Sequence, residues 1–346
     1  MSTRQPVHIG QVGVGYWGKN LLRNLLSLPD VQVSMICEVD PEKRTALRTQ
    51  YPDIPITERF EDIVNSPSID AVVIATQTPL HFPMAEAALR AGKHVFVEKP
   101  LAQTTAEAEK LVELTEHHDR ILMVGHLLLY HPAFRYVEDL IRNRQLGDIY
   151  YLYSIRVNLG IIRQNENAFD SLAPHDLSLA LQFLQSNPIS VSAQGQAYLQ
   201  PGIEDVVFAS ITFENSQLAH LHTSWLDPHK IRKVTVVGSH KMAVIDDMES
   251  AEKVRIYDKG VDRVPTAEHY ASYTEAMAIR NGDILIPRIS MKEPLRLECE
   301  HFINCIRTGR QPRSNVWNGF QVVRMLEAAR QSLREHGKAI TLSYDV

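Results

Sequence analysis

Two short segments of the sequence combine residue types that suit hydride transfer. The first is an apolar strand pattern over residues 7–12 that runs into the turn GVGYWG at 13–18. The second is an apolar strand pattern over 95–97 that ends in Glu98-Lys99-Pro100. Ligands of an open parallel sheet bind outside the carboxyl ends of its strands, so both segments are expected to face one crevice. A dinucleotide held by the turn would then lie beside the lysine.

Each glycine of the turn has its own expected task. Gly13 permits the tight turn after the strand, Gly15 lets the backbone approach a pyrophosphate, and Gly18 lets the next helix pack closely. That helix, expected from about residue 16 to residue 26, presents N–H groups and a positive dipole end to phosphates. Tyr16 and Trp17 lie in the turn and are candidate cofactor contacts. Trp17 is expected either to contact the cofactor, by packing on the nicotinamide or closing the crevice, or to be a core residue.

The second strand pattern, residues 31–37, ends at an acidic residue, Glu38. A carboxylate at this place accepts hydrogen bonds from an adenosine ribose and repels a 2′-phosphate, which favours NAD over NADP. Lys43 and Arg44 follow closely enough to leave NADP open. The remaining candidate cofactor residues follow later strands: Thr76, Thr78, His81, Glu98 and Lys99. His81 either lines the nicotinamide half of the site or caps the next helix.

Oxidation of a secondary alcohol needs a base for the proton and an acceptor for the hydride. His175 is the candidate base, because it stands where a helical pattern is expected to start and a helix N-terminus keeps histidine neutral. Lys99 can hydrogen-bond the same hydroxyl and stabilise an alkoxide. The structural alternatives are a capping or core histidine at 175, and an ion pair of Lys99 with Glu98 or Asp176.

The bulk properties exclude several classes of protein. A chain of 346 residues predicts two domains, which we place at 1–125 and 126–346. A net charge of −5 argues against nucleic acid as the main partner. Neither a long apolar stretch nor a signal-peptide pattern is present, so we expect a cytoplasmic protein without a membrane partner. Three cysteines without a CxxC spacing predict neither a disulfide framework nor a metal site.

The first 125 residues alternate strand and helix patterns. Residues 70–75 form a continuous apolar run, typical of a strand buried on both faces. Thr104 and Glu107 have the spacing of a capping box for a helix that ends near residue 118. A further strand is expected at 121–124. The sequence therefore predicts an α/β Rossmann domain with a doubly wound parallel sheet.

After residue 126 the patterns change to strands at short spacing, which indicate hairpins. Six strands are expected at 149–157, 189–199, 206–213, 217–226, 234–237 and 241–245, and three helices at 133–143, 294–308 and 316–334. We interpret this part as an α+β domain with a large open, mostly antiparallel sheet. Residues 258–287 are the segment most expected to be a flexible loop. Tyr150, Tyr151 and Tyr153 on one strand indicate an apolar sheet face, so a homodimer or homotetramer is expected.

The motifs GVGYWG, the acidic residue after the second strand, and VEKP at 97–100 together resemble the Gfo/Idh/MocA oxidoreductase family over essentially the whole chain. The resemblance implies reversible oxidation of a sugar or cyclitol hydroxyl with a nicotinamide cofactor. Further motifs at 158–163, 172–176, 198–205, 224–228 and 294–300 resemble the nucleotide-sugar 3-dehydrogenases within that family. They imply NAD-dependent oxidation at C3 of a UDP-N-acetylhexosamine, which feeds 3-amino-sugar synthesis for lipid A and lipopolysaccharide.

For such a substrate, Arg163 is the candidate ligand of the pyrophosphate, because a guanidinium binds phosphate oxygens bidentately. Asn158, Asn167 and Tyr130 are candidate sugar contacts. One departure concerns the aspartate that many family members carry four residues before the histidine. Ser171 stands there, and the nearest aspartate is Asp170. The open alternatives are another sugar substrate (a UDP-linked uronate, a free sugar or inositol) and a cofactor-binding regulator without catalysis.

Overall fold

The structure is a computed structural model that describes residues 5–263 and 277–343. By its internal contacts the chain forms two units. The first unit comprises Met1–His131 and Lys292–Arg324, and the second comprises Pro132–Met291 and Met325–Val346. These divisions differ from the single boundary expected at residue 125, because a late segment of the chain returns to the first unit.

The first unit contains a six-stranded parallel sheet with the strand order β3-β2-β1-β4-β5-β6. Its strands are β1 (Val7–Val12), β2 (Val31–Cys37), β3 (Ile56–Thr57), β4 (Ala71–Ile74), β5 (His94–Glu98) and β6 (Leu122–Gly125). Its helical segments are α1 (Gly18–Leu26), α2 (Pro41–Gln50), α3 (Phe60–Val64), η1 (Thr78–Leu80), α4 (His81–Arg90), α5 (Thr105–His118), η2 (Leu127–Tyr130) and α8 (Pro294–Thr308). α9 (Val316–Arg334) begins here and continues into the second unit. This order is that of a doubly wound dinucleotide-binding sheet, as expected.

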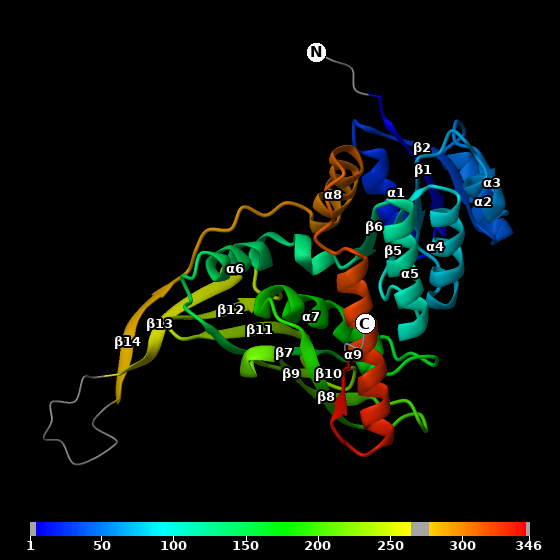
Figure 1. The fold of residues 1–346 in the computed structure, drawn as a ribbon. Coiled ribbons are helices and arrows are strands. Elements are labelled where there is room, and N and C mark those ends of the chain that lie inside the picture. Colours follow the sequence, from blue (N-terminus) through cyan, green and yellow to red (C-terminus); the bar gives the residue numbers. More distant parts are fainter. Residues whose placement is uncertain (1–4, 264–276, 344–346) are drawn as a thin grey trace, which may run out of the picture. The chain divides into compact units, whose positions relative to one another are not determined.

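Local sequence explains why these elements form. β4 is buried along its whole length, as a strand covered on both faces requires. Thr104 and Glu107 form the expected capping box at the start of α5. In Figure 1, α1 and α8 lie beside each other on one side of the sheet, and α4 and α5 lie together on the other. Because β1, β4 and β5 are neighbouring parallel strands, their carboxyl ends lie at the same edge of the sheet.

The second unit is built on a nine-stranded sheet with the order β14-β13-β12-β11-β7-β10-β9-β8-β15. Its strands are β7 (Ile149–Val157), β8 (Pro188–Gln196), β9 (Val206–Phe213), β10 (Leu218–Ser224), β11 (Ile231–Gly238), β12 (Met242–Asp246), β13 (Val254–Arg263), β14 (Met277–Leu285) and β15 (Ile340–Thr341). Its helices are α6 (Pro132–Arg142), α7 (Ala168–Leu184) and η3 (Glu214–Ser216). All neighbouring strands are antiparallel except the pair β7 and β10. The expected mostly antiparallel sheet is confirmed.

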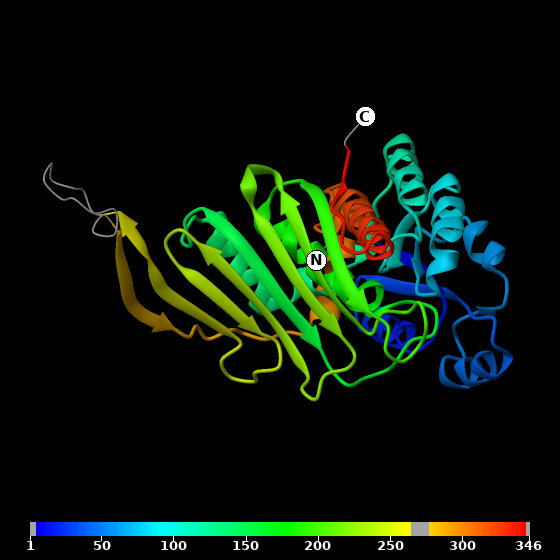
Figure 2. The same cartoon turned by 90° about the horizontal axis from the view of Figure 1, so that it is seen from below.

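One face of this sheet is covered and the other is open. α7 packs on β7, β9 and β10. Figure 2 looks onto the opposite face, across which the described part of the chain places no helix. On that face Tyr151 and Tyr153 pair in register with Leu218 and His220 of β10. Both tyrosines and the leucine are exposed.

Residues 258–287 were expected to be a loop, and this expectation is wrong for the part that the structure describes. β13 and β14 run through it as an antiparallel pair. Residues 264–276 lie outside the described residues. Polar side chains and weak periodicity concealed the strands, because β14 is exposed along almost its whole length and has no buried face to impose alternation.

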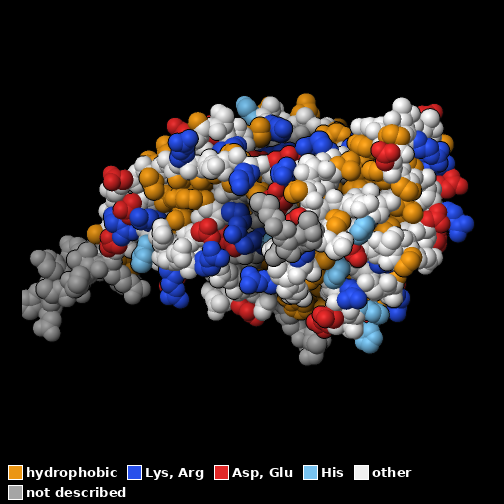
Figure 3. All heavy atoms as spheres, turned by 90° about the horizontal axis from the view of Figure 1, so that it is seen from above, with side chains coloured by type: hydrophobic (Ala, Val, Ile, Leu, Met, Phe, Trp, Pro, Cys, Tyr) orange, Lys and Arg blue, Asp and Glu red, His pale blue; other side chains and the backbone are white. Residues whose placement is uncertain are grey.

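Among the described residues, no helix combines the length and apolar character needed to cross a bilayer. Within the same residues, no group of three or more His, Cys, Asp or Glu side chains could hold a metal ion. Figure 3 presents one face of the molecule, on which basic and acidic side chains are intermingled.

Candidate functional site

The glycine turn between β1 and α1 has the geometry that a dinucleotide requires. Gly13 adopts a φ of +85°, and a Cβ there would lie 2.6 Å from the carbonyl oxygen of Ala75. A Cβ on Gly18 would clash with the carbonyl oxygen of Gly13. Over Gly15, by contrast, a Cβ would meet no described atom within 4 Å. The turn is therefore tight beneath and open above Gly15, on the side where a pyrophosphate would approach the backbone.

Two side chains hold this turn. The amide of Gln11, fully buried on β1, donates to the carbonyl oxygens of Gly13 at 3.2 Å and Gly18 at 2.8 Å. The indole of Trp17, the residue that caps α1, donates a hydrogen bond to the carboxyl group of Glu98 at the end of β5. Sequence reasoning missed Gln11, although a glutamine inside an otherwise apolar strand was a visible signal. Tyr16, in contrast, is 90 % exposed, and its carbonyl oxygen accepts from the Asn20 amide at 3.2 Å.

Glu38 lies where the sequence predicts the ribose ligand. Its carboxylate accepts hydrogen bonds from the backbone N–H of Val14 at 2.8 Å and of Asp40 at 3.1 Å. A carboxylate offers about four acceptor positions, so two remain for the hydroxyls of a ribose. Glu38 also joins the glycine turn to the segment after β2, a structural role that the sequence did not indicate.

The end of β5 carries a cluster of buried titratable groups. Burial raises the pKa of Glu98, against the opposing effect of the Lys99 charge. Burial raises the pKa of Glu298 on α8 far above its ordinary value, and the charge of Glu98 adds to that rise. His126, at the end of β6, has no hydrogen-bond partner for either ring nitrogen among the described residues. Burial, helped by the Lys99 charge, lowers the pKa of His126 to about 3.

Lys99 is half-buried beside this cluster of buried titratable groups. Its charge acts on His81, Glu98 and His126, all of which are buried. An ammonium group in a region of low dielectric stabilises nearby negative charge more strongly than one in water. Asp176, named above as an alternative partner, forms a bidentate pair with Arg156 within the second unit, at 2.6 and 2.9 Å.

His81 is buried, and both of its ring nitrogens lie within hydrogen-bond distance of backbone carbonyl oxygens. Its ring is 1 % exposed, with Nδ1 at 2.7 Å from the carbonyl oxygen of Pro100 and Nε2 at 3.2 Å from that of Thr76. It therefore joins the loop after β4 to the Glu98-Lys99-Pro100 segment. Two other predicted cofactor residues belong to the same loop. The Thr76 hydroxyl donates to the Gln77 carbonyl oxygen at 3.4 Å, and Thr78 is the first residue of the short helix η1.

In the second unit, His175 lies on α7 but not at its start. The helix begins at Ala168, capped by the Asn167 side chain, and contains Pro174. The helix N-terminus therefore does not keep His175 neutral, contrary to expectation, because the dipole effect falls off within the first turn. The buried pair of Arg156 and Asp176 joins β7 to the helix at the residue after His175.

The family's aspartate position is occupied by Ser171, and Asp170 does not replace it. The Asp170 carboxylate pairs with Arg330 of α9 at 3.1 Å, and burial raises its pKa to about 6. Its function in this structure is to join two helices of the second unit.

The segment between β7 and α7 carries the candidate pyrophosphate ligand. The Arg163 side chain is 53 % exposed, and its nearest acidic partner is Glu166 at 3.7 Å. Gln200 donates to the Arg163 carbonyl oxygen at 2.9 Å and so fixes the backbone beneath the guanidinium. Asn158, at the start of the segment, is half-buried and donates its backbone N–H to Ser224.

Two candidate sugar contacts are corrected by the structure. Asn167 caps α7 by accepting from the Asp170 N–H, and its amide donates to Glu204 at 2.8 Å. Tyr130 is 4 % exposed in the first unit, and its hydroxyl lies 2.8 Å from the Ser314 hydroxyl. Both side chains are occupied by structural bonds, which their residue types alone did not reveal.

Asp205 is a residue that sequence reasoning missed. It is fully buried and accepts from the Trp225 indole at 2.7 Å and from the backbone N–H groups of Tyr198 and Leu199. Burial acts to raise its pKa, but these hydrogen bonds outweigh it and lower the pKa overall. Asp205 thereby organises the loop at 198–205 that supports the Arg163 segment.

Comparison with known families gives two matches. A model of the NAD-binding Rossmann fold of the Gfo/Idh/MocA oxidoreductases matches residues 7–126, and a model of the Gfo/Idh/MocA C-terminal domain matches residues 134–244. Together they span the glycine turn, the Lys99 segment and the helix that carries His175.

Individual relatives are distant in sequence. UDP-N-acetylglucosamine 3-dehydrogenase from Acidithiobacillus ferrooxidans is 28 % identical over 243 residues, which is 70 % of this chain and 72 % of the relative. Its solved structure covers 96 % of this chain and 99 % of its own, with a TM-score of 0.80 and 22 % identity. Inositol 2-dehydrogenase from Acidothermus cellulolyticus is 23 % identical over 357 residues, 100 % of this chain and 98 % of the relative.

A solved relative contains the cofactor. The structure of scyllo-inositol dehydrogenase from Lactobacillus casei with bound NAD(H) and scyllo-inositol has a TM-score of 0.78 and 20 % identity. It covers 97 % of this chain and 99 % of that chain. The open space over Gly15, the donor end of α1 and the carboxylate of Glu38 fit this cofactor.

Proposed function

Because this chain belongs to the Gfo/Idh/MocA family of NAD-dependent oxidoreductases, we propose that it oxidises the C3 hydroxyl of a UDP-linked N-acetylhexosamine, with UDP-N-acetylglucosamine as substrate. The observation that carries the chemistry is the hydrogen bond between Trp17 and Glu98. It joins the glycine turn to the residue that precedes Lys99, all within the first unit. Because the charge of Lys99 also acts on Glu98, we infer that the ammonium group lies near the turn that we assign to the dinucleotide.

The chain's own residues divide the work of alcohol oxidation. When bound, the nicotinamide supplies the acceptor for the hydride. We assign His175 the hydroxyl proton, which a neutral imidazole accepts on a ring nitrogen. Lys99 donates a hydrogen bond to the substrate oxygen and stabilises its growing negative charge. Gln11, Trp17 and His81 hold the turn and the loops in place by the bonds described above.

The substrate class is supported by two observations. The relative from A. ferrooxidans is named for UDP-N-acetylglucosamine, and it matches 70 % of this chain. Arg163 presents an exposed guanidinium on a backbone that Gln200 fixes, which suits the pyrophosphate of a nucleotide sugar. The nucleotide then supplies remote binding energy that orients C3 for reaction. The alternative, an inositol, is favoured by the full-length match to an inositol 2-dehydrogenase.

A substrate panel tests the proposal. NADH formation is followed with NAD and, separately, UDP-N-acetylglucosamine, free N-acetylglucosamine and myo-inositol. We expect turnover of the UDP-sugar, far slower turnover of the free sugar, and a product whose mass is lower by two hydrogen atoms. Equal rates with free and UDP-linked sugar would refute the nucleotide-sugar assignment, and turnover of inositol alone would establish the alternative.

The product of this reaction, a 3-keto sugar, suits a transaminase that would install a 3-amino group for lipid A and lipopolysaccharide. Addition of a purified aminotransferase with glutamate should therefore convert the product to an amino sugar, detected by mass spectrometry. If the product were not aminated, the proposal that it supplies an aminotransferase would be refuted.

We also propose that a second copy of the chain covers the open sheet face, giving a homodimer or homotetramer. Tyr151, Tyr153 and Leu218 lie exposed on that face together with Phe208, whose ring stacks on His222 at 4.3 Å. Exposed apolar surface of this kind marks interfaces. Sedimentation at micromolar concentration tests the proposal, and a stable monomer would refute it.

A further inference from the structure

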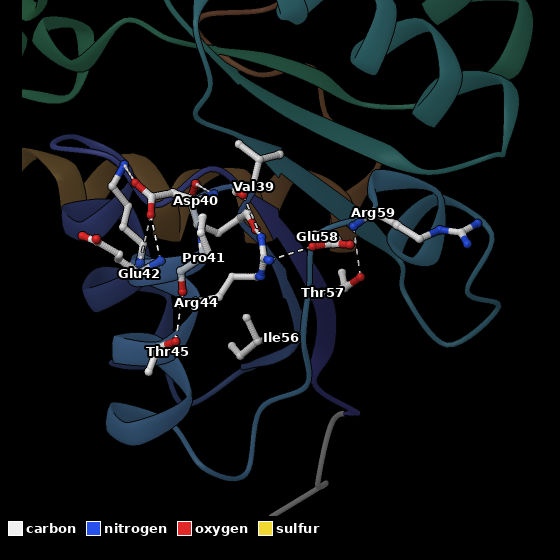
Figure 4. Close-up of polar contacts among 12 residues, drawn as sticks. Val39, Asp40, Pro41, Glu42, Arg44, Thr45, Ile56, Thr57, Glu58 and Arg59 are labelled. Atoms are coloured by element: carbon white, nitrogen blue, oxygen red, sulfur yellow. Dashed lines mark hydrogen bonds and ion pairs between the residues drawn. The ribbon is translucent and has the colours of Figure 1, made fainter.

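The segment after β2 carries two basic side chains, and each is paired with an acid. Lys43 lies 3.6 Å from Asp40, within the first turn of α2. The Arg44 guanidinium lies 2.6 Å from the carboxylate of Glu58, which follows β3. Figure 4 shows Arg44 pointing from α2 towards Glu58, beneath the segment that contains Val39 and Asp40. Arg44 also contacts the backbone of Glu38, the residue that fits the ribose.

Arg44 is held more firmly than Lys43. Its Nη1 donates to the carbonyl oxygen of Val39 at 2.7 Å and to that of Glu38 at 3.1 Å. Its Nη2 makes the pair with Glu58, and the side chain is only 14 % exposed. Three acceptors thus direct the guanidinium away from solvent, under the backbone on which an adenosine ribose would rest.

The position of Glu58 is itself fixed by the sheet. The carbonyl oxygen of Thr57 accepts from the Glu38 N–H at 3.0 Å, so β3 is aligned with the end of β2. The Thr57 hydroxyl accepts from the Arg59 N–H at 3.1 Å and closes the turn around Glu58. The Glu58 carboxylate is 64 % exposed, so it can be replaced without opening the core.

We propose that Glu58 is a determinant of cofactor choice, because it neutralises and restrains the Arg44 guanidinium, which would otherwise be a candidate ligand for the 2′-phosphate of NADP. Such a phosphate carries a charge of about −1.5 to −2 and is bound best by an arginine fork. With Glu58 in place, the charge of Arg44 is compensated and three of its N–H donors are directed at Val39, Glu38 and Glu58. Glu38 repels the 2′-phosphate directly, and Glu58 prevents the Arg44 guanidinium from attracting it. This inference rests on the preference for NAD over NADP that Glu38 predicts.

The test is a calorimetric titration of NAD and of NADP with the wild type and with Glu58→Ala. In the wild type we expect NAD to bind at least about tenfold more tightly than NADP, since Glu38 favours the unphosphorylated ribose. In Glu58→Ala we expect NADP to bind about five- to tenfold more tightly than in the wild type, as an uncompensated cation would give at this range. Affinity for NAD should stay within about twofold.

Two further variants separate the proposed cause from others. In the double variant Glu58→Ala, Arg44→Gln the gain in NADP affinity should disappear. Glu86→Gln removes a carboxylate of the first unit that pairs with Arg90 at 2.7 Å, on α4, and should leave both affinities unchanged. An equal gain in Glu86→Gln, or a gain that survives without Arg44, would overturn the proposal, as would an unchanged NADP affinity in Glu58→Ala. A wild type that binds both cofactors equally would instead refute the NAD preference itself.

Discussion

The region assigned to the cofactor and the region assigned to the substrate are built in different ways. The glycine turn and the end of β5 lie at the ends of regular strands. Buried Gln11 holds the turn itself, and buried Glu98 connects the end of β5 to Trp17 of the turn. The Arg163 segment, residues 158–167, lies between regular elements and depends on contacts from a second loop. The first arrangement suits a ligand common to a whole family. The second can change without disturbing a strand, which suits a substrate that differs among relatives.

The largest effect is expected at Lys99, in the cofactor region. Lys99→Met keeps the length of the side chain and removes its charge, so kcat should fall by about 10²- to 10⁴-fold. Affinity for NAD should change as well, because the ammonium group lies in the network that reaches the glycine turn. Steady-state kinetics and calorimetry measure the two effects, and near-normal kcat would exclude Lys99 from the chemistry.

A loss of similar size, about 10²- to 10⁴-fold in kcat, is expected for His175→Ala in the second unit. Since His175 belongs to the substrate side of the comparison, affinity for NAD should stay almost unchanged. His229→Ala, which alters an exposed histidine of the same unit, serves as the control. If His175→Ala kept normal turnover, the proton would have to leave by another group.

Arg163→Ala tests whether the loop segment holds the pyrophosphate. Loss of a charge-assisted contact costs about 1.5–3 kcal/mol, so KM for the UDP-sugar should rise by about 10- to 150-fold while affinity for NAD stays the same. Arg142→Ala is a matched control, because its side chain is similarly exposed and also pairs with an acid three residues away. Weaker binding of NAD in Arg163→Ala would reverse the assignment of the two regions.

A separate effect concerns the dependence of stability on pH, which the buried His126 should produce. The pKa of His126 is about 3 in the folded chain, against 6.5 for an unperturbed histidine. Below about pH 6.5, His126 therefore binds a proton in the unfolded chain but not in the folded chain. As a consequence, the free energy of unfolding decreases as the pH falls from about 6.5 towards 3. The slope contributed is at most about 1.4 kcal/mol per pH unit.

His126→Asn should remove this contribution. Urea unfolding between pH 7 and pH 4 compares the slopes of the variant and the wild type, so a constant offset in stability from the substitution cancels. Identical slopes would mean that His126 is accessible to protons in the folded chain and that the region is wetter than described.

Sequence reasoning succeeded where a residue's task is local. The helices at 294–308 and 316–334 and the strands at 149–157 and 206–213 have the bounds expected from periodicity. It failed where the task depends on a distant partner. The amides and hydroxyls of Asn167 and Tyr130 looked available for a sugar, but Glu204 and Ser314 occupy them. Asp205 received no role, because its partner Trp225 is twenty residues away.

The sequence by itself determined the doubly wound sheet, the glycine turn and the family, because each depends on residue types at fixed short spacing along one or two strands. Gly13 needs its positive φ, and Gly18 its missing Cβ, whatever the rest of the chain does. Only the tertiary structure decided which charges are available to a ligand. Arg44 pairs with Glu58, and Asp176 pairs with Arg156. The partners are too far apart in sequence for a local pattern to predict either pair. Coulomb energy and desolvation depend on distance in space and on burial, and the folded chain alone sets both.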